Sequence, residues 1–435
     1  MIILDMLRAE ILTCVFKRIL VSSKHYSLWN DDSMRVFSVF FHPDPSISAV
    51  GGAEKRFVET LRILKRRGDV EVTIVESKPS LLWGLGVGCE NHEISNPISA
   101  HKGGWLGIYV GWIVWSLKAL IRCLRIVRGQ NYDLVLAPNN TAPNLIPAYF
   151  VHHVSHLPLC VIVHHIDVIS LFAQPSFSTV YHTYRETGFS RSASLLKTLA
   201  FRVILEVLKR CDRCITVSNS TARTLVNNGV PEERVYVTGN GVDVKYIDGF
   251  KFEGRKSYTG VFVGRISKEK GVFDLVAAWR RIVEVKDDAR LLFVGSGPDI
   301  DAVRCRVVEL GLERNVVVKG RCADGEMYKL MKASEVFIFP SVFEGWGLTV
   351  AEALACGLPV VCYDIPALRE VFGKCRSVFL VPIRDVEKLA ATVLEVLDVN
   401  RTSVLAGTSR NFVKNLSWSK VAMQDLQVLN SCCHN

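Results

Sequence analysis

Two glutamates, Glu344 and Glu352, frame the stretch of this chain that is best suited to chemistry. A carboxylate binds sugar hydroxyls well because it accepts two or more hydrogen bonds and donates none. The turn between them contains Gly345, Trp346, Gly347 and Leu348. Glycines at a loop-to-helix turn let backbone N–H groups at the positive helix end approach an anion. The stretch predicts a phosphate cradle between two hydroxyl clamps, which suits a sugar nucleotide; the alternative is two solvated surface glutamates.

The neighbouring residues predict how this stretch is positioned. Residues 336–339 form a short apolar run with two phenylalanines, which is typical of a buried strand. Residues 340–347 are expected to form a loop and residues 348–356 a helix. Gly357 supplies the left-handed residue that ends a helix, and Pro359 prevents its continuation.

Two further groups of residues suit a diphosphate. Gly51 and Gly52 open a helix that is expected to end near residue 67, and their amides can approach an anion in the same way. Arg265 and Lys270 flank the start of another helix, where two cations and the helix amides suit a diphosphate leaving group. The alternatives are a tight glycine turn and a pair of solvated surface charges.

A histidine pair follows the strand expected at residues 159–163. Residues just past the carboxyl end of a strand face the ligand crevice in an open α/β sheet. His164 is therefore the first candidate, followed by His165 and then Asp167. The alternative is a loop histidine that makes a structural hydrogen bond.

Residues 339–360, with the sequence FPSVFEGWGLTVAEALACGLPV, resemble a known family. The two glutamates and their spacing are similar to the E-x7-E motif of the retaining glycosyltransferases of family four, also called glycosyl transferases group 1. Further family-like segments occur in order at residues 51–54 (GGAE), 217–221 (VSNST), 240–243 (NGVD) and 264–271 (GRISKEKG). The resemblance covers the chain from about residue 34 onwards.

The resemblance implies a fold and an activity. The fold would be GT-B, in which two doubly wound Rossmann-like domains face each other across a cleft, and the alternation of strands and helices independently favours such parallel α/β sheets. The activity would be that of a retaining hexosyltransferase with a nucleotide-diphosphate sugar as donor and a glycan, lipid-linked or small-molecule acceptor. No metal-holding motif is evident, so we expect neither a metal nor another cofactor.

The resemblance also implies roles for the candidate residues. Arg265 and Lys270 would stabilise the charge that develops on the leaving diphosphate. Glu344 would hold sugar hydroxyls, Glu352 would hold ribose hydroxyls, and His164 would lie near the donor sugar and the acceptor. Two other functions stay open: a non-hydrolysing sugar-nucleotide epimerase of the same fold, and a catalytically degenerate subunit that only binds sugar nucleotides.

The length of 435 residues, with 49% hydrophobic and 22% charged residues, indicates a globular protein of two domains. Its expected parts are an N-terminal extension (1–33), an acceptor-side Rossmann-like domain (34–250), a nucleotide-sugar-binding Rossmann-like domain (251–410), and a final helix that crosses back to the first domain (411–435).

The net charge of +10 is concentrated between residues 99 and 213. Nothing in the sequence has the spacing of a nucleic-acid-binding motif, so an anionic membrane surface or phosphorylated substrates fit better. The uncharged run at residues 103–117 is shorter than the roughly 20 residues that span a bilayer. Its aromatic residues are Trp105, Tyr109, Trp112 and Trp115, and the cations after it are Lys118, Arg122, Arg125 and Arg128. This pattern favours equally a helix lying in a membrane interface and a core helix of the first domain.

The 13 cysteines come without a secretory signal, because charged residues interrupt the apolar run near the N-terminus. They indicate a reducing, cytoplasmic compartment with free thiols. The membrane-interface interpretation of the basic helix would place the protein peripherally on the cytoplasmic face of the membrane. The pair Cys211 and Cys214 has CxxC spacing but no second pair, so a zinc site is not expected.

Overall fold

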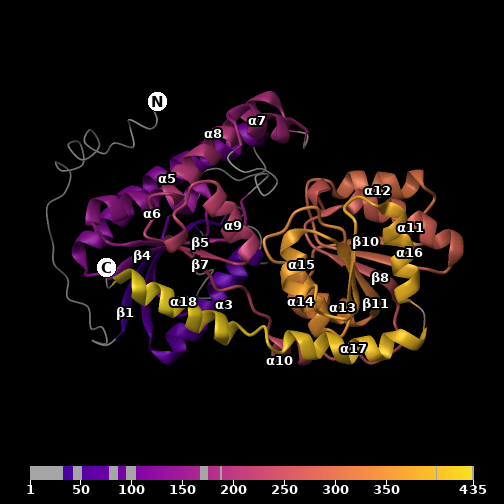
Figure 1. Cartoon of the computed structure of the whole chain (residues 1–435). Coiled ribbons are helices and arrows are strands. Elements are labelled where there is room, and N and C mark those ends of the chain that lie inside the picture. Colours follow the sequence, from indigo (N-terminus) through magenta and orange to yellow (C-terminus); the bar gives the residue numbers. More distant parts are fainter. Residues whose placement is uncertain are drawn as a thin grey trace.

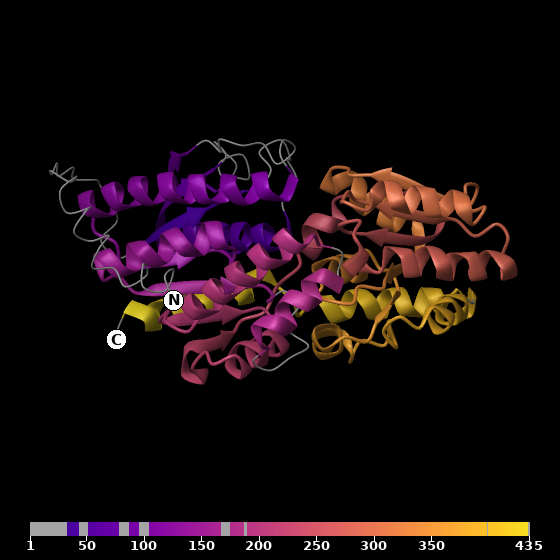
Figure 2. The ribbon, with the colours of Figure 1, turned by 90° about the horizontal axis from the view of Figure 1, so that it is seen from above.

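The computed structural model describes residues 33–42, 51–77, 87–94, 104–166, 175–186, 189–397 and 399–433. Within them the chain forms two sheets, and every strand pairing between neighbours is parallel. Helices cover both faces of each sheet, and the two layered units lie end to end (Figures 1 and 2). The predicted class, two doubly wound α/β domains, is confirmed.

The first domain is built on a seven-stranded sheet in the order β3-β2-β1-β4-β5-β6-β7. Its strands are β1 (Met34–Phe40), β2 (Val70–Glu76), β3 (Glu90–Glu93), β4 (Leu134–Ala137), β5 (Leu159–Val163), β6 (Arg213–Thr216) and β7 (Val235–Val237). Its helices are α3 (Gly52–Arg67), α5 (Gly104–Gly129), α6 (Ala142–Ser155), α7 (Phe177–Glu186), α8 (Arg191–Leu208), α9 (Asn219–Asn227) and the short η2 (Glu232–Arg234). The central strands β4 and β5 are buried along their whole length, as expected where helices cover both faces.

The second domain is built on a six-stranded sheet in the order β10-β9-β8-β11-β12-β13. Its strands are β8 (Tyr258–Val263), β9 (Leu291–Val294), β10 (Val316–Gly320), β11 (Ser334–Phe339), β12 (Val360–Tyr363) and β13 (Val378–Val381). Its helices are α10 (Val244–Asp248), η3 (Lys268–Lys270), α11 (Val272–Val285), α12 (Ile300–Glu309), α13 (Asp324–Lys332), α14 (Leu348–Ala355), α15 (Pro366–Phe372), α16 (Val386–Val396) and α17 (Val399–Val413). In both sheets the strand order reverses beside the first strand, which puts a ligand crevice at the carboxyl ends of the strands.

The two strands predicted at residues 159–163 and 336–339 are present as β5, which agrees at both ends, and β11, which begins two residues earlier. The strand β3 was not predicted, because its residues are polar and carry no alternating apolar pattern. Among the described strands it pairs only with β2 and lies at the sheet edge, where exposure tolerates such a sequence.

The last helix, α18 (Trp418–Cys433), leaves the second domain and packs against α3 of the first. Figure 1 shows it running beneath the first sheet. Its Asp425 accepts a hydrogen bond from the buried Arg56 of α3 at 2.8 Å and another from Thr238 at 2.7 Å. The C-terminal helix is thus joined to the first domain by a buried ion pair.

The helix α5 resolves the two interpretations of the tryptophan pattern in favour of the core. Trp115 is fully buried; its indole N–H donates to the carbonyl of Ile94, and its ring lies 4.7 Å from that of Phe41. Trp112 is half-buried against the same Phe41 ring. The side chains of Trp105 and Tyr109 lie outside the described residues. The interpretation of these tryptophans as a membrane-interface stripe is therefore wrong for the two that are described.

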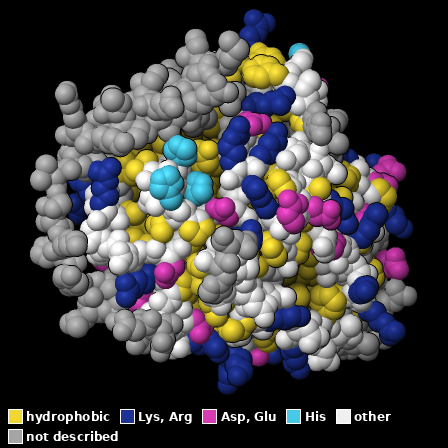
Figure 3. Space-filling view, turned by 60° about the vertical axis from the view of Figure 1, so that its left-hand side comes forward, with side chains coloured by type: hydrophobic (Ala, Val, Ile, Leu, Met, Phe, Trp, Pro, Cys, Tyr) yellow, Lys and Arg dark blue, Asp and Glu magenta, His cyan; other side chains and the backbone are white. Residues whose placement is uncertain are grey.

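The outward face of α5 is aliphatic and basic instead. Its exposed hydrophobic side chains are Val110, Ile113, Leu117 and Ile121, and its exposed cations are Lys118, Arg122, Arg125 and Arg128. Basic and hydrophobic side chains also lie close to one another on the face of the molecule drawn in Figure 3. Among the described residues, no helix has the length and apolar character needed to cross a bilayer.

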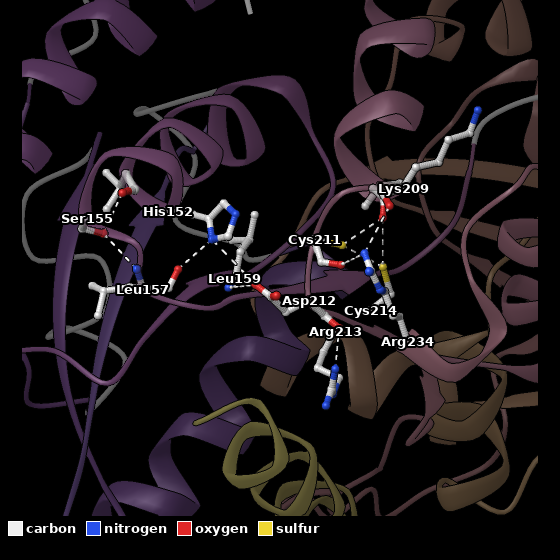
Figure 4. A network of polar contacts seen from close by, with 12 residues as sticks. His152, Ser155, Leu157, Leu159, Lys209, Cys211, Asp212, Arg213, Cys214 and Arg234 are labelled. Carbon is white, nitrogen blue, oxygen red and sulfur yellow. Dashed lines mark hydrogen bonds and ion pairs between the residues drawn. The ribbon is translucent and has the colours of Figure 1, made fainter. Parts of the chain in front are cut away.

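The CxxC pair belongs to the core of the first domain. It is part of a polar network at the amino-terminal ends of the neighbouring strands β5 and β6 (Figure 4). The sulfurs of Cys211 and Cys214 lie 3.2 Å apart, and both residues are fully buried. The hydrogen bond between the two sulfurs and burial both raise the pKa of Cys211. Asp212, between them, accepts a hydrogen bond from the backbone N–H of Leu159 at 2.7 Å. In the part of the chain that the structure describes, no cluster of three or more His, Cys, Asp or Glu is arranged to hold a metal.

Candidate active site

The predicted strand–loop–helix at the glutamate pair is present as β11, a loop and α14. Gly347 caps α14 with φ +96°, a left-handed conformation that a residue with a side chain rarely adopts. Leu348 begins the helix, so the amides of its first turn lie at the carboxyl end of β11. The predicted strand, loop and helix are therefore confirmed, and the phosphate cradle at the helix start stays a prediction.

Glu344 forms an ion pair with Lys270, whose Nζ donates to Glu344 Oε1. Both side chains are less than a fifth exposed, at 15% and 18%. Lys270 ends η3 in the loop after β8, and β8 and β11 are neighbours in the sheet. The carboxyl ends of two adjacent strands thus bring together a cation and an acid that are 74 residues apart.

Arg265 lies in the same loop and is largely exposed. Its Nη2 donates to Glu269 Oε1 at 2.6 Å. The backbone carbonyl of Glu269 in turn accepts from the N–H of Val342 at 3.0 Å, which ties this loop to the loop that carries Glu344. Arg265 and Lys270 therefore belong to one loop packed against the glutamate turn.

Glu352 lies in α14 and is 5% exposed. Its Oε1 accepts from Lys55 Nζ at 2.5 Å and from the Tyr328 hydroxyl at 3.0 Å, and Lys55 also donates to that hydroxyl at 2.9 Å. Burial lowers the pKa of Lys55, but Glu352 and Tyr328 raise it by more, so that the lysine stays charged. Lys55 comes from the first turn of α3 in the other domain.

The two domains touch at two more places, and each contact joins two candidate residues. A Cβ atom on Gly345 would overlap the carbonyl oxygen of His164, and one on Gly52 would lie 3.1 Å from Leu348 Cδ1. The glycine turn of the second domain therefore packs against the β5 end and the α3 start of the first. Four of the described candidates, Gly52, His164, Gly345 and Leu348, therefore meet at this junction.

Gly51 is the N-cap of α3 and makes no side-chain cap. The carboxylate of Glu54 folds back beside it, since a Cβ on Gly51 would overlap Glu54 Oε2. An acid therefore already lies beside the helix amides that were predicted to meet an anion.

His164 is 9% exposed and its Nε2 donates to the carbonyl of Pro138 at 3.2 Å. Burial, with a further contribution from the Arg56 guanidinium, lowers the pKa of His164 to about 3. The imidazole is therefore neutral, with its Nε2 proton held by the backbone. His165 is exposed, and its ring lies 5.5 Å from that of Phe343 across the junction. Asp167 lies outside the described residues.

Trp346 was expected among the donor-binding residues, but its side chain belongs to the core of the second domain. It is 5% exposed and packs edge-on against Phe372, with 5.3 Å between ring centroids. Only its backbone is available to a ligand.

Sequence reasoning missed Lys55, Arg56 and Tyr328. Arg56 is fully buried; it donates to Thr238 and to the carbonyl of Gly239 and pairs with Asp425. Two cations directly after Gly51-Gly52-Ala53-Glu54 were a visible signal, but an amphipathic helix usually carries such charges on its solvent face. Their partners are distant in sequence, so nothing local identified them.

Two family models match adjacent parts of the chain. Residues 50–246 match the model described as Glycosyltransferase Family 4, and residues 249–415 match the model described as Glycosyl transferases group 1. An uncharacterized glycosyltransferase of Methanocaldococcus jannaschii is 28% identical over 52% of this chain and 62% of its own length. The phosphatidyl-myo-inositol mannosyltransferase of Mycolicibacterium smegmatis is 32% identical over 43% of this chain and 50% of its own length. This chain thus spans less than two thirds of these relatives.

Solved structures share the architecture over almost the whole chain. Anabaena HepE, solved with UDP and glucose, superposes with a TM-score of 0.68 at 18% identity and covers 92% of this chain and 100% of its own. The sucrose-phosphate synthase of Thermosynechococcus elongatus gives a TM-score of 0.69 at 18% identity, over 92% of this chain and 98% of its own. The fold is GT-B, and because the two family models together account for most of the chain, it belongs to the group 1, family 4-like glycosyltransferases.

Proposed function

We propose that this protein transfers a hexose from a nucleoside-diphosphate sugar to a glycan, lipid-linked or small-molecule acceptor, with retention of the anomeric configuration. One observation carries the proposal. Lys270 and Glu344 form an ion pair beside the α14 amides, at the junction where Gly345 meets His164. Cation, acid and free amides converge there, as binding of a charged diphosphate and a hydroxyl-rich sugar requires.

In the proposed reaction the bond between the anomeric carbon and the diphosphate oxygen breaks, and its electron pair leaves with the nucleotide. The acceptor oxygen then bonds to the anomeric carbon from the same face, and its proton passes to an oxygen of the departing diphosphate. Arg265 and Lys270 stabilise the negative charge on the leaving diphosphate, which grows as the bond breaks, so they bind the transition state better than the ground state. We propose that these protein cations act without a metal or another cofactor.

Glu344 and Glu352 take the hydroxyl-binding roles in this proposal. Glu344 holds the sugar and Glu352 the ribose, since carboxylates accept hydrogen bonds from vicinal hydroxyls. His164 is neutral, so it contributes its backbone and its imidazole as polar groups near the sugar rather than a positive charge.

The choice of donor class has support from structural neighbours. HepE has been solved with UDP and with UDP-glucose. A relative from Mycobacterium tuberculosis, 30% identical over 40% of this chain and 48% of its own length, is named alpha-maltose-1-phosphate synthase. The ligands in the HepE structures make UDP-glucose the first donor to test.

The test is a panel of UDP-, GDP- and ADP-sugars, scored by nucleotide release with and without candidate acceptors. We expect release from one nucleotide class, faster with the right acceptor, and a product with the donor's anomeric configuration by NMR. Failure of every donor to bind or react would contradict the proposal, and an inverted product would contradict retention. An epimerase would instead change the sugar's stereochemistry without any acceptor.

We further propose an anionic membrane surface as a partner of the first domain. Besides α5, the helices α7 and α8 carry exposed hydrophobic side chains, namely Phe177, Leu195 and Leu199. Figure 1 shows these three helices along the upper side of this domain, which Figure 2 views directly. Aliphatic side chains beside Lys118, Arg122 and Arg125 suit the interface of an anionic bilayer.

Vesicle flotation tests this partner. Wild type is expected to float with vesicles that contain anionic lipid and not with purely zwitterionic ones. The double variant Ile113→Gln/Leu117→Gln should lose this binding. The matched control Val285→Gln/Val308→Gln, which changes exposed valines of the second domain, should keep it. Equal flotation of both variants, or none with wild type, would count against the surface.

A further inference from the structure

The contact between Lys55 and Glu352 joins the two domains through a single carboxylate. Lys55 Nζ, Glu352 Oε1 and the Tyr328 hydroxyl form a closed triangle with sides of 2.5, 2.9 and 3.0 Å. The Glu352 side chain is 6% exposed and that of Lys55 is 25% exposed. A partly buried, charge-assisted pair of this kind holds its members in one geometry more firmly than a surface pair does.

The two oxygens of Glu352 are used unequally. Lys55 and Tyr328 both donate to Oε1, whereas Oε2 accepts no hydrogen bond from any described residue. An ionised carboxylate has about four lone-pair sites, so Oε2 can still accept hydrogen bonds from a ligand. The triangle therefore orients the carboxylate and leaves one oxygen free to bind.

Lys55 reaches Glu352 only because the domains are close together. It lies in α3, directly after Gly52, while Glu352 and Tyr328 belong to α14 and α13 of the other domain. Glu370 of α15 makes a second polar contact across the junction, accepting from the backbone N–H groups of Asn219 and Ser220 at 2.7 and 2.8 Å. The orientation of Glu352 thus depends on the approach of the first domain.

We propose that Lys55 is a positioning residue that couples approach of the two domains to recognition of the donor ribose. By holding Oε1, it presents Oε2 of Glu352 to the ribose hydroxyls of the nucleotide. This inference rests on the proposed function, since it assumes a nucleotide donor. Lys55 acts through Glu352 and does not touch the departing diphosphate.

The experiment measures nucleotide binding, so that it does not depend on turnover. The probes are UDP, GDP and ADP and their 2′,3′-dideoxyribose counterparts, titrated calorimetrically into wild type, Lys55→Met, Lys55→Arg and Glu352→Gln. For the nucleotide that wild type binds best, Lys55→Met should weaken binding about 10-fold, the effect of losing one hydrogen bond to a charged group. Binding of the dideoxy counterpart should change less than about twofold, because it lacks the hydroxyls that Oε2 would bind. Lys55→Arg should restore part of the loss.

Two controls separate positioning from general damage. Lys65→Met removes a cation of the same helix that pairs with Glu71 inside the first domain, and it should leave binding unchanged. The double variant Lys55→Met/Glu352→Gln should bind no more weakly than Glu352→Gln alone, because both changes remove one interaction. With the donor accepted by wild type, Lys55→Met should raise KM and leave kcat within about twofold.

Three results would overturn the inference. They are unchanged nucleotide binding in Lys55→Met, an equal loss for ribose and dideoxyribose probes, and a fall in kcat with constant KM, which would place Lys55 at the diphosphate. If Lys55→Met does not fold, binding of the ribose and dideoxyribose probes by Lys55→Arg decides. If Lys55→Arg binds both probes more weakly by the same factor, its preference for ribose equals that of wild type, and the inference is also overturned. Failure of the proposed function looks different: wild type itself would bind none of the nucleotides.

Discussion

The backbone of Gly345 lies directly against the carbonyl of His164, so that no side chain fits between the two domains at this point. The glycine belongs to the turn after β11 and the histidine follows β5. The carboxyl ends of the two sheets are therefore in van der Waals contact through one glycine.

A methyl group at this position should separate the two loops. Because close-packed interiors yield little, Gly345→Ala must shift one loop by roughly 1 Å, and a misplacement of that size can cost about 100-fold in rate. We expect kcat/KM for the donor to fall by about that factor. Gly407→Ala is the control, since Gly407 lies in α17 with open space around it, and it should be neutral or stabilising by about 0.5–1 kcal/mol. Wild-type kcat/KM in Gly345→Ala would contradict a functional junction.

The cations beside Glu344 should affect the chemical step. Lys270→Ala and Arg265→Ala are each expected to lower kcat by about 10²–10³-fold, because they remove charge that the leaving diphosphate needs in the transition state. Lys268→Ala changes an exposed lysine in the same short helix and should retain activity. Steady-state kinetics on the accepted donor decide. Full transferase activity in the double variant Arg265→Ala/Lys270→Ala would end the mechanistic assignment.

His164 should make the protein less stable in acid. Burial and Arg56 lower its pKa to about 3, whereas an unfolded chain has a histidine pKa of about 6.5. Between pH 6.5 and 3 the unfolded state binds a proton at this histidine, whereas the folded state does not. The contribution of the neutral His164 to the free energy of unfolding is therefore fully present above pH 6.5 and is lost as the pH falls towards 3. The slope is about 1.4 kcal/mol per pH unit, or about 2 kcal/mol between pH 6.5 and 5.

Urea unfolding at pH 5 and pH 7.5 measures this effect. His164→Gln keeps a donor for the Pro138 carbonyl but cannot titrate, so its loss of stability between the two pH values should be about 2 kcal/mol smaller than that of wild type. An equal pH dependence in both proteins would mean that His164 titrates normally.

The buried ion pair between Arg56 and Asp425 should hold α18 on the first domain. Asp425→Asn leaves the Arg56 charge without a counter-ion in an interior where Arg56 is fully buried. Removing one partner of such a pair costs about 3–5 kcal/mol. The matched control is Asp69→Asn, which breaks the exposed pair with Arg67 and should cost about 0–1 kcal/mol. Equal losses in the free energy of unfolding would show that burial of the Arg56 pair has no special effect.

The sequence by itself was sufficient for apolar strands such as β5 and for the glutamate turn, although not for the polar edge strand β3. The strands β5 and β11 contain short apolar runs next to a proline, and α14 ends at a Gly–x–Pro signal, so each is encoded by adjacent residues. The motif around Glu344 and Glu352 is likewise local. These features were predicted because their physical causes lie within a few residues of one another.

Tertiary structure alone decided which charges meet. Lys55 and Glu352 are 297 residues apart, and Arg56 and Asp425 are 369 apart, so no local pattern connects them. It also decided that Trp115 points into the core and that the Trp346 side chain is buried, since the inward face of a helix or turn is set by what packs against it. Propensity and periodicity act along the chain, whereas ion pairing, burial and the pKa of His164 arise from neighbours brought close in space.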